Sequence, residues 1–169
     1  MPPPTVSPPI AIRAAASASD VAQVRTLFVE YAATLSIDLR YQGFAEELAT
    51  LPGAYAAPRG MLLLAGPADA AIGCVALRPL VGTRLNEHAT LAEIKRLYVR
   101  PEARGTGLGR RLMESVVTGA RAIGYRELKL DTLEQMREAQ LLYGKFGFRE
   151  CAPYYDSPIT GTVYMSLTL

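Results

Sequence analysis

The chain has 169 residues, of which 50% are apolar and 20% are charged. A chain of this length buries enough surface to fold as one globular domain without disulfides or structural metals. Its 18 Lys and Arg residues nearly balance 16 Asp and Glu residues, which leaves a formal net charge of +2. That excess is too small for nucleic-acid binding by phosphate neutralisation unless basic residues cluster on one face. The apolar stretches, such as 70–77, fall well short of the roughly 20 residues that a membrane-spanning helix needs.

The two cysteines, Cys74 and Cys151, form neither a disulfide framework nor a spacing typical of metal ligands. The opening residues have neither the basic segment nor the apolar core of a secretory signal peptide. We therefore expect a cytoplasmic protein with reduced thiols and no metal, and with no nucleic-acid or membrane partner.

Residues 1–9 contain five prolines and no charge, which predicts a disordered, extended tail ahead of a folded domain over 10–169. A proline-rich recognition arm is the alternative function for this tail. The domain is expected to open with a short strand over 10–13. Ser19 and Asp20 then offer N-cap oxygens to a helix with a regular apolar face.

A second helix is predicted over 44–51, where a Pro-Gly pair ends it. Two short apolar runs, 61–65 and 72–77, are separated by turn residues and predict a hairpin. A longer strand follows over 90–100 and alternates in character. Strict alternation places one set of side chains on one face and a second set on the other: Glu93, Lys95, Leu97 and Val99 against Ile94, Arg96 and Tyr98.

The last third of the chain predicts a helix over 108–123 ended by Gly124, a strand over 127–131, a helix over 134–146 and a final strand over 163–169. Short turns favour antiparallel pairing of the early strands, whereas the strand–helix–strand order favours a parallel pair. We expect an α/β (α+β) domain with one mixed, mostly antiparallel sheet of about six or seven strands and about four helices.

A glycine-rich loop, Arg104-Gly105-Thr106-Gly107-Leu108-Gly109-Arg110, joins the long strand to the next helix. Glycines at alternate positions expose backbone N–H groups, and the helix N-terminus adds its free donors and positive dipole end. This arrangement predicts a phosphate cradle, with a ligand-free turn as the alternative. The spacing is neither G-x-G-x-x-G, because Arg110 takes the place of the third glycine, nor a P-loop.

A second motif, Tyr143-Gly144-Lys145-Phe146-Gly147-Phe148, ends the later helix, whose apolar face includes Ala139 and Leu142. A tyrosine on such a face either packs in the core with its hydroxyl at the rim or presents that hydroxyl to a ligand.

Together the two motifs resemble the core of the GNAT superfamily of acyl-CoA-dependent N-acetyltransferases. The matching text is Glu93–Val99, Pro101, Arg104–Gly109 and Leu142–Phe148. The resemblance implies a single GNAT-like domain that uses acetyl-CoA (coenzyme A) as cosubstrate. It places the pyrophosphate on the glycine loop and the pantetheine arm along the strand, where that strand splays from 127–131. The residues it implies for cosubstrate binding are Leu97, Tyr98, Val99, Arg104, Gly105, Thr106, Gly107, Leu108, Gly109, Arg110, Ala139 and Tyr143.

One position departs from the family's pattern. Many members have an asparagine seven residues before the helix tyrosine, where this chain has Met136. We therefore assign Met136 no binding role.

Acetyl transfer to an amine needs a deprotonated amine, a donor to the thioester oxygen and a proton for the departing sulfur. Tyr143 is predicted to protonate the sulfur, as in family members with this motif, and a strand N–H near Leu97 or Tyr98 to serve the oxygen. Glu93 is predicted to be the base, as in some histone-acetylating members, and an ion-paired role beside Lys95 is the alternative. The single histidine, His88, is more typical of a solvent-facing loop.

The resemblance also implies that the acceptor enters between the first two helices and the last hairpin, over 36–44 and 153–158. Asp38 and Asp156 would suit a cationic amine, although both also fit turn chemistry, whereas Arg40 would suit a carboxylate. The predicted function is transfer of an acetyl group to a primary amine of a small molecule, amino acid or peptide. A non-catalytic acyl-CoA-binding regulatory module is the alternative. The apolar last strand leaves a homodimer open.

Overall fold

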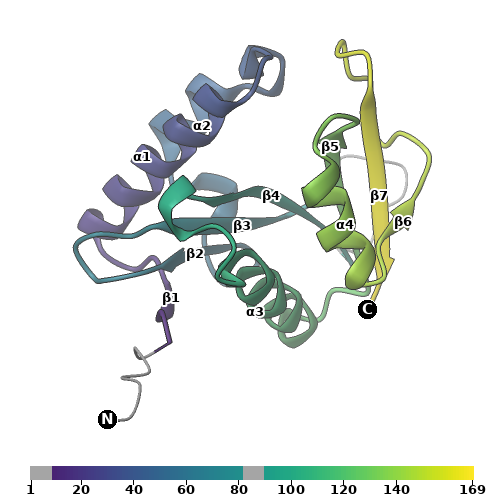
Figure 1. Ribbon diagram of the computed structural model, residues 1–169. Coiled ribbons are helices and arrows are strands. Elements are labelled where there is room, and N and C mark those ends of the chain that lie inside the picture. Colours follow the sequence, from purple (N-terminus) through teal and green to yellow (C-terminus); the bar gives the residue numbers. More distant parts are fainter. Residues whose placement is uncertain (1–8, 82–89) are drawn as a thin grey trace, which may run out of the picture.

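The computed structural model describes residues 9–81 and 90–169 (Figure 1). The tail expected over 1–9 lies outside the described residues except for Pro9, and so does His88.

A seven-stranded sheet runs through the domain in the order β1-β2-β3-β4-β5-β7-β6. Every neighbouring pair is antiparallel except β4 and β5, which are parallel. This mixed, mostly antiparallel sheet with four α-helices confirms the predicted fold class. The strands are β1 (Ile12–Ala14), β2 (Met61–Ala65), β3 (Gly73–Pro79), β4 (Leu91–Val99), β5 (Glu127–Leu133), β6 (Arg149–Glu150) and β7 (Thr162–Thr168).

The helices cover both faces of the sheet (Figure 1). Helix α1 (Ala18–Thr34) packs with residues near α2 (Phe44–Thr50) on one face, and α3 (Leu108–Ile123) packs on the other, beside α4 (Arg137–Lys145). Three short 3-10 turns complete the fold: η1 (Leu39–Gln42), η2 (Gly53–Tyr55) and η3 (Pro101–Ala103).

Helix α1 begins earlier than the sequence predicted. Its N-cap is Ser17, so the assignment of Ser19 and Asp20 as N-caps is wrong. Ser17 Oγ accepts the Asp20 N–H at 3.0 Å, and the Asp20 carboxylate accepts the Ser17 N–H at 3.1 Å. This capping box satisfies two end donors at once, which explains why the helix starts there.

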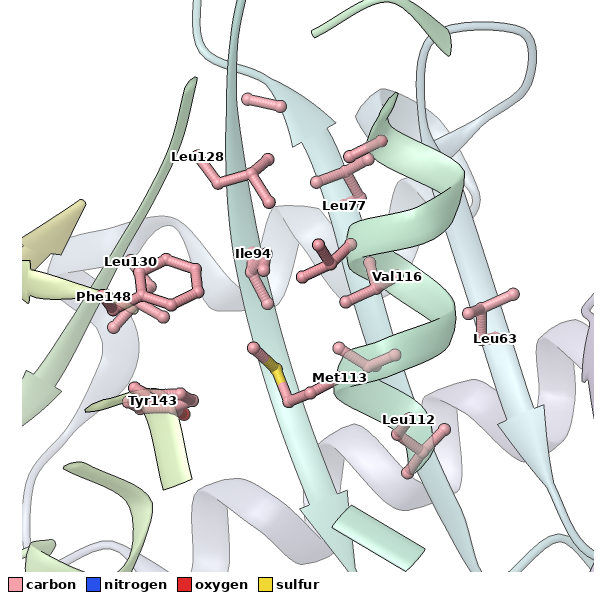
Figure 2. Packing of buried hydrophobic residues seen from close by; sticks show 14 of the residues in the cluster. Leu63, Leu77, Ile94, Leu112, Met113, Val116, Leu128, Leu130, Tyr143 and Phe148 are labelled. Atoms are coloured by element: carbon pink, nitrogen blue, oxygen red, sulfur yellow. The ribbon is translucent and has the colours of Figure 1, made fainter. Parts of the chain in front are cut away.

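Helix α3 supplies the centre of the larger core. Figure 2 shows Met113 and Val116 extending from α3 toward Ile94 of the sheet, and Leu112 belongs to the same core. All three helix side chains are fully buried, which stabilises the domain by roughly 1.5–3 kcal/mol for each. The helix ends at Gly124 as predicted, with that glycine in the left-handed region.

The second half of the sheet differs from the prediction at two boundaries. β5 extends to Leu133 because it pairs with β7 along its whole length, up to Leu133 opposite Thr162. Consequently α4 begins at Arg137 rather than 134.

The sheet opens between its two parallel strands. β4 and β5 pair only from Leu91 opposite Glu127 to Glu93 opposite Lys129. Beyond this point β4 continues to Val99 and β5 to Leu133 without pairing to each other. The facing edges therefore offer backbone donors and acceptors to another chain-like ligand.

Candidate active site

Strand β4 contains a β-bulge where it borders the opening. Ala76 of β3 lies opposite Lys95, but Cys74 lies opposite Tyr98, so β4 carries one residue more than β3 over this step. Arg96, within the bulge, has φ +60°, which is unusual for a residue with a side chain. A bulge of this kind re-aims the side chains that follow it.

The bulge overturns one prediction about faces. Leu97 and Val99 pack with Ile94 against the α3 core, whereas Tyr98 belongs to the α1 core. The expectation that Glu93 shares a face with Leu97 and Val99 is therefore wrong. Alternation holds only for an uninterrupted strand, and the extra residue shifts it by one position.

Buried side-chain contacts hold Arg96 in its strained conformation. Its guanidinium donates to Glu47 of α2 from Nη2 at 2.7 Å and from Nε at 3.2 Å, and it lies over the Phe44 ring at 5.2 Å. Burial by itself lowers the pKa of Arg96, but the bonds and charge of Glu47 outweigh it and raise that pKa. These contacts offset the roughly 1–3 kcal/mol that such a backbone conformation costs.

The glycine loop opens α3 in a conformation that suits an anion. Gly105 has φ +76° and Gly107 has φ +80°. A Cβ at either would meet nothing within 4 Å, so these positions need glycine for its backbone freedom rather than for space. Because the first helical bond runs from the Arg111 N–H to the Gly107 carbonyl, the three preceding amides have no helical acceptor.

A groove runs from this loop along the free edge of β4 to α4. Every residue that the resemblance implied for cosubstrate binding lines it, except Thr106 and Tyr143. The Thr106 hydroxyl turns back to donate to the Ala103 carbonyl at 2.7 Å. Met136, which was given no binding role, lines the groove as well.

Tyr143 lines a second cavity, deeper between β4 and β5, that shares Tyr31, Leu97 and Met136 with the groove. Its ring packs against Phe148 at 6.1 Å between centroids (Figure 2). Within residues 9–81 and 90–169 its hydroxyl has no hydrogen-bond partner. Burial raises the pKa of Tyr143, so the hydroxyl remains protonated near neutral pH.

Glu93 is fully buried and held by three partners. Its Oε2 pairs with Arg78 Nη2 at 2.8 Å, its Oε1 accepts from the Tyr154 hydroxyl at 2.8 Å, and Lys95 Nζ lies 3.5 Å from Oε1. The ion-paired arrangement that the sequence offered as an alternative is thus present. The assignment of Glu93 as base stays a prediction.

Asp131 of β5 is a polar site residue that sequence reasoning missed. Its carboxylate bonds to Lys95 Nζ at 3.1 Å, to the Tyr155 hydroxyl at 2.8 Å and to Gln42 Nε2 at 3.3 Å. Burial raises the pKa of Asp131, but Lys95 and these bonds outweigh it and lower that pKa overall. The available signal was an acidic residue at the end of the strand that was predicted to border the opening.

The residues that the sequence predicted to bind the acceptor, namely Asp38, Arg40 and Asp156, are all exposed. Asp38 is the N-cap of η1 and accepts the Arg40 N–H, while the Arg40 side chain is 87% exposed. The turn alternative is therefore confirmed for Asp38. The described part of the chain contains no helix suited to span a membrane and no metal-binding cluster of acidic, His or Cys residues.

The chain is similar to acetyltransferases of the GNAT family. The family model of the acetyltransferase (GNAT) domain matches residues 58–150. An uncharacterized N-acetyltransferase of Schizosaccharomyces pombe is 37% identical over 95% of each chain. A second, from Dictyostelium discoideum, is 29% identical over 85% of this chain and 91% of its own.

Solved structures give the same picture for the fold. An acetyltransferase from Streptococcus agalactiae has a TM-score of 0.73 at 22% identity, with 95% of this chain and 98% of that chain covered. A structure from Salmonella typhimurium, determined with its cofactor acetyl-CoA, has a TM-score of 0.68 at 19% identity, over 95% and 94% of the two chains.

Proposed function

Because the chain belongs to the GNAT family of acetyltransferases, we propose that it transfers the acetyl group of acetyl-CoA directly to a primary amine of a small molecule, amino acid or peptide. One observation carries this proposal: the groove that runs from the glycine loop along the free edge of β4 shares Tyr31, Leu97 and Met136 with the cavity that Tyr143 lines. A ligand bound along the groove therefore ends next to the Tyr143 cavity.

The glycine loop supports binding of the pyrophosphate. The first amides of α3 have no helical acceptor, and the helix dipole favours negative charge near them. Gly105 and Gly107 hold the loop in left-handed conformations that other residues adopt only with strain. The pantetheine amides then pair with β4 at Leu97 to Val99, by the same strand addition that sheet edges offer to peptides.

The bulge and Tyr143 support the chemical step. An N–H at Leu97 or Tyr98, beside the bulge, stabilises the negative charge that develops on the thioester oxygen. The Tyr143 hydroxyl, kept protonated by burial, donates a proton or hydrogen bond to the departing sulfur. Thiolates with a conjugate-acid pKa of about 8.5 leave poorly without such help.

The amine must lose its proton before it attacks. Glu93 lines a third cavity, on the acceptor side, and we assign it the role of base. Ion pairs with Arg78 at 2.8 Å and Lys95 at 3.5 Å hold the Glu93 carboxylate in place beside this cavity.

Calorimetry with acetyl-CoA tests the groove first, and release of free thiol across an amine panel tests turnover. Tyr143→Phe should bind acetyl-CoA normally but turn over roughly 10²–10⁴-fold more slowly, the usual effect of losing an acid catalyst. The matched control is Tyr125→Phe, because Tyr125 is equally buried but donates to the Arg59 carbonyl, away from both cavities.

Three outcomes separate the alternatives. Absence of acetyl-CoA binding refutes the proposal as a whole. Binding without thiol release for any amine favours the non-catalytic binding module. An unchanged rate constant in Tyr143→Phe removes Tyr143 from the mechanism but leaves the transferase function standing.

A further inference from the structure

The acceptor-side cavity adjoins the cavity that Tyr143 lines. Both cavities include Tyr41, Gln42 and Lys95 in their walls. A molecule bound on the acceptor side therefore lies next to the proposed reacting end of acetyl-CoA. The groups along this entrance determine which amines suit it.

A cation stands at the mouth of this entrance. The Arg78 side chain is 33% exposed, whereas the side chains of Glu93, Lys95 and Asp131 are 2%, 5% and 11% exposed. Of these four charged side chains, Arg78 is therefore the most accessible to a ligand that arrives from solvent.

The two carboxylates are already neutralised by the chain itself. Lys95 Nζ lies between them, 3.5 Å from Glu93 and 3.1 Å from Asp131, and it also donates to Gln42 Oε1. With Arg78 included, two cations face two anions, so the charges of this cluster cancel. The Lys95 ammonium occupies the position between Glu93 and Asp131 that an additional positive charge of an acceptor would need.

We infer that the acceptor is an amine that carries a carboxylate next to its amino group, that is, an α-amino acid. This inference rests on the proposed function. The carboxylate of the amino acid binds the Arg78 guanidinium, and its amino group points toward Glu93, the assigned base, and the cavity that Tyr143 lines. A guanidinium has five N–H donors, more than its pair with Glu93 requires, and it matches carboxylate geometry.

A protein lysine would bring no carboxylate to Arg78, whereas a free α-amino acid carries one next to its amino group.

The test compares acceptors that share a side chain and carry a carboxylate, a carboxamide or neither group next to the amine. L-leucine is measured against L-leucinamide and 3-methylbutylamine, and L-phenylalanine against L-phenylalaninamide and phenethylamine, by thiol release from acetyl-CoA. We expect the wild-type protein to show a kcat/KM at least about tenfold higher for one of the amino acids than for its amide, a difference of about 1.4 kcal/mol. This comparison needs no variant.

Measurements on Arg78→Gln then test whether Arg78 is the residue that causes the preference for amino acids over amides. Arg78 also holds Glu93, so the variant is expected to lose activity toward every acceptor. The informative quantity is the ratio of kcat/KM for amino acid and amide, in which the common loss cancels. We expect this ratio to fall about tenfold in Arg78→Gln and to be partly restored in Arg78→Lys, which keeps the charge but not the fork.

Each failure has its own signature. Turnover of amides and simple amines at or above the rate of the amino acids overturns this inference and leaves the transferase function intact. A preference for amino acids that survives in Arg78→Gln overturns the role of Arg78. Absence of acetyl-CoA binding refutes the proposed function itself.

Discussion

Replacing Glu47 with Gln tests whether the bulge of β4 depends on a buried ion pair. The substitution keeps the shape of the side chain but removes its charge. Arg96 is 3% exposed and Glu47 is 10% exposed, so neither group can exchange its partner for bulk water. The Tyr55 hydroxyl also donates to Glu47. The N–H₂ group of the new amide cannot accept a hydrogen bond. It therefore faces either the Arg96 guanidinium or the Tyr55 hydroxyl, and that hydrogen bond is lost.

The size of the effect follows from this burial. Removing one member of a buried pair leaves the other charge uncompensated, which costs about 3–5 kcal/mol. At about 2–4 °C for each kcal/mol in a domain of this size, the melting temperature should fall by roughly 6–20 °C. The matched control is Glu114→Gln, which breaks the pair with Arg110, whose side chains are 50% and 71% exposed. An exposed i,i+4 pair contributes only about 0.3–0.5 kcal/mol.

Urea unfolding monitored by circular dichroism gives both free energies of unfolding under the same conditions. The reasoning predicts a clear separation between the two variants. If Glu47→Gln loses no more stability than Glu114→Gln, the ion pair does not hold the strained Arg96, and another cause of the bulge must be sought.

Two further predictions concern the glycine loop and the acidic residue of β5. Gly107→Ala adds no clash but forces an alanine into φ +80°, so we expect about 1–2 kcal/mol of destabilisation and weaker acetyl-CoA binding by calorimetry; unchanged affinity would contradict the cradle. The pKa of Asp131 lies below its ordinary value of 3.8, so its ionised form stabilises the fold above that pH, and the stabilisation disappears as pH falls through the lowered value. Wild type should therefore be more stable than Asp131→Asn at pH 7, and the gap should narrow below about pH 4 in urea titrations; a constant gap would contradict the assigned pKa direction.

The parts of the fold that the sequence predicted are those that depend on local signals. The apolar face of α3 and the glycine after it are sufficient to define that helix, and both were visible in the chain. The glycine loop was visible for the same reason, because glycine adopts the positive φ of Gly105 and Gly107 without strain.

The parts that could not be predicted depend on contacts between distant segments. Arg96 adopts positive φ although arginine has no preference for it, and its partner Glu47 comes from α2. Asp131 is a site residue only because Lys95 of β4, Gln42 of η1 and Tyr155 from the segment after β6 converge on it. No local pattern contains that convergence.

The bulge connects these observations with the proposed chemistry. In a regular strand, Glu93 and Leu97 would share one face of the sheet. The acceptor amine and the thioester would then have to reach the strand from the same face. The extra residue instead turns Leu97 and Val99 toward the α3 core, while Glu93 and Lys95 line the acceptor side. One strand can therefore offer its edge to the thioester and its buried charges to the amine, with Arg96 fixed between them by a helix of the acceptor side. On this view the Arg96–Glu47 pair is a positioning device, because its loss would disturb the geometry between the two substrate sites.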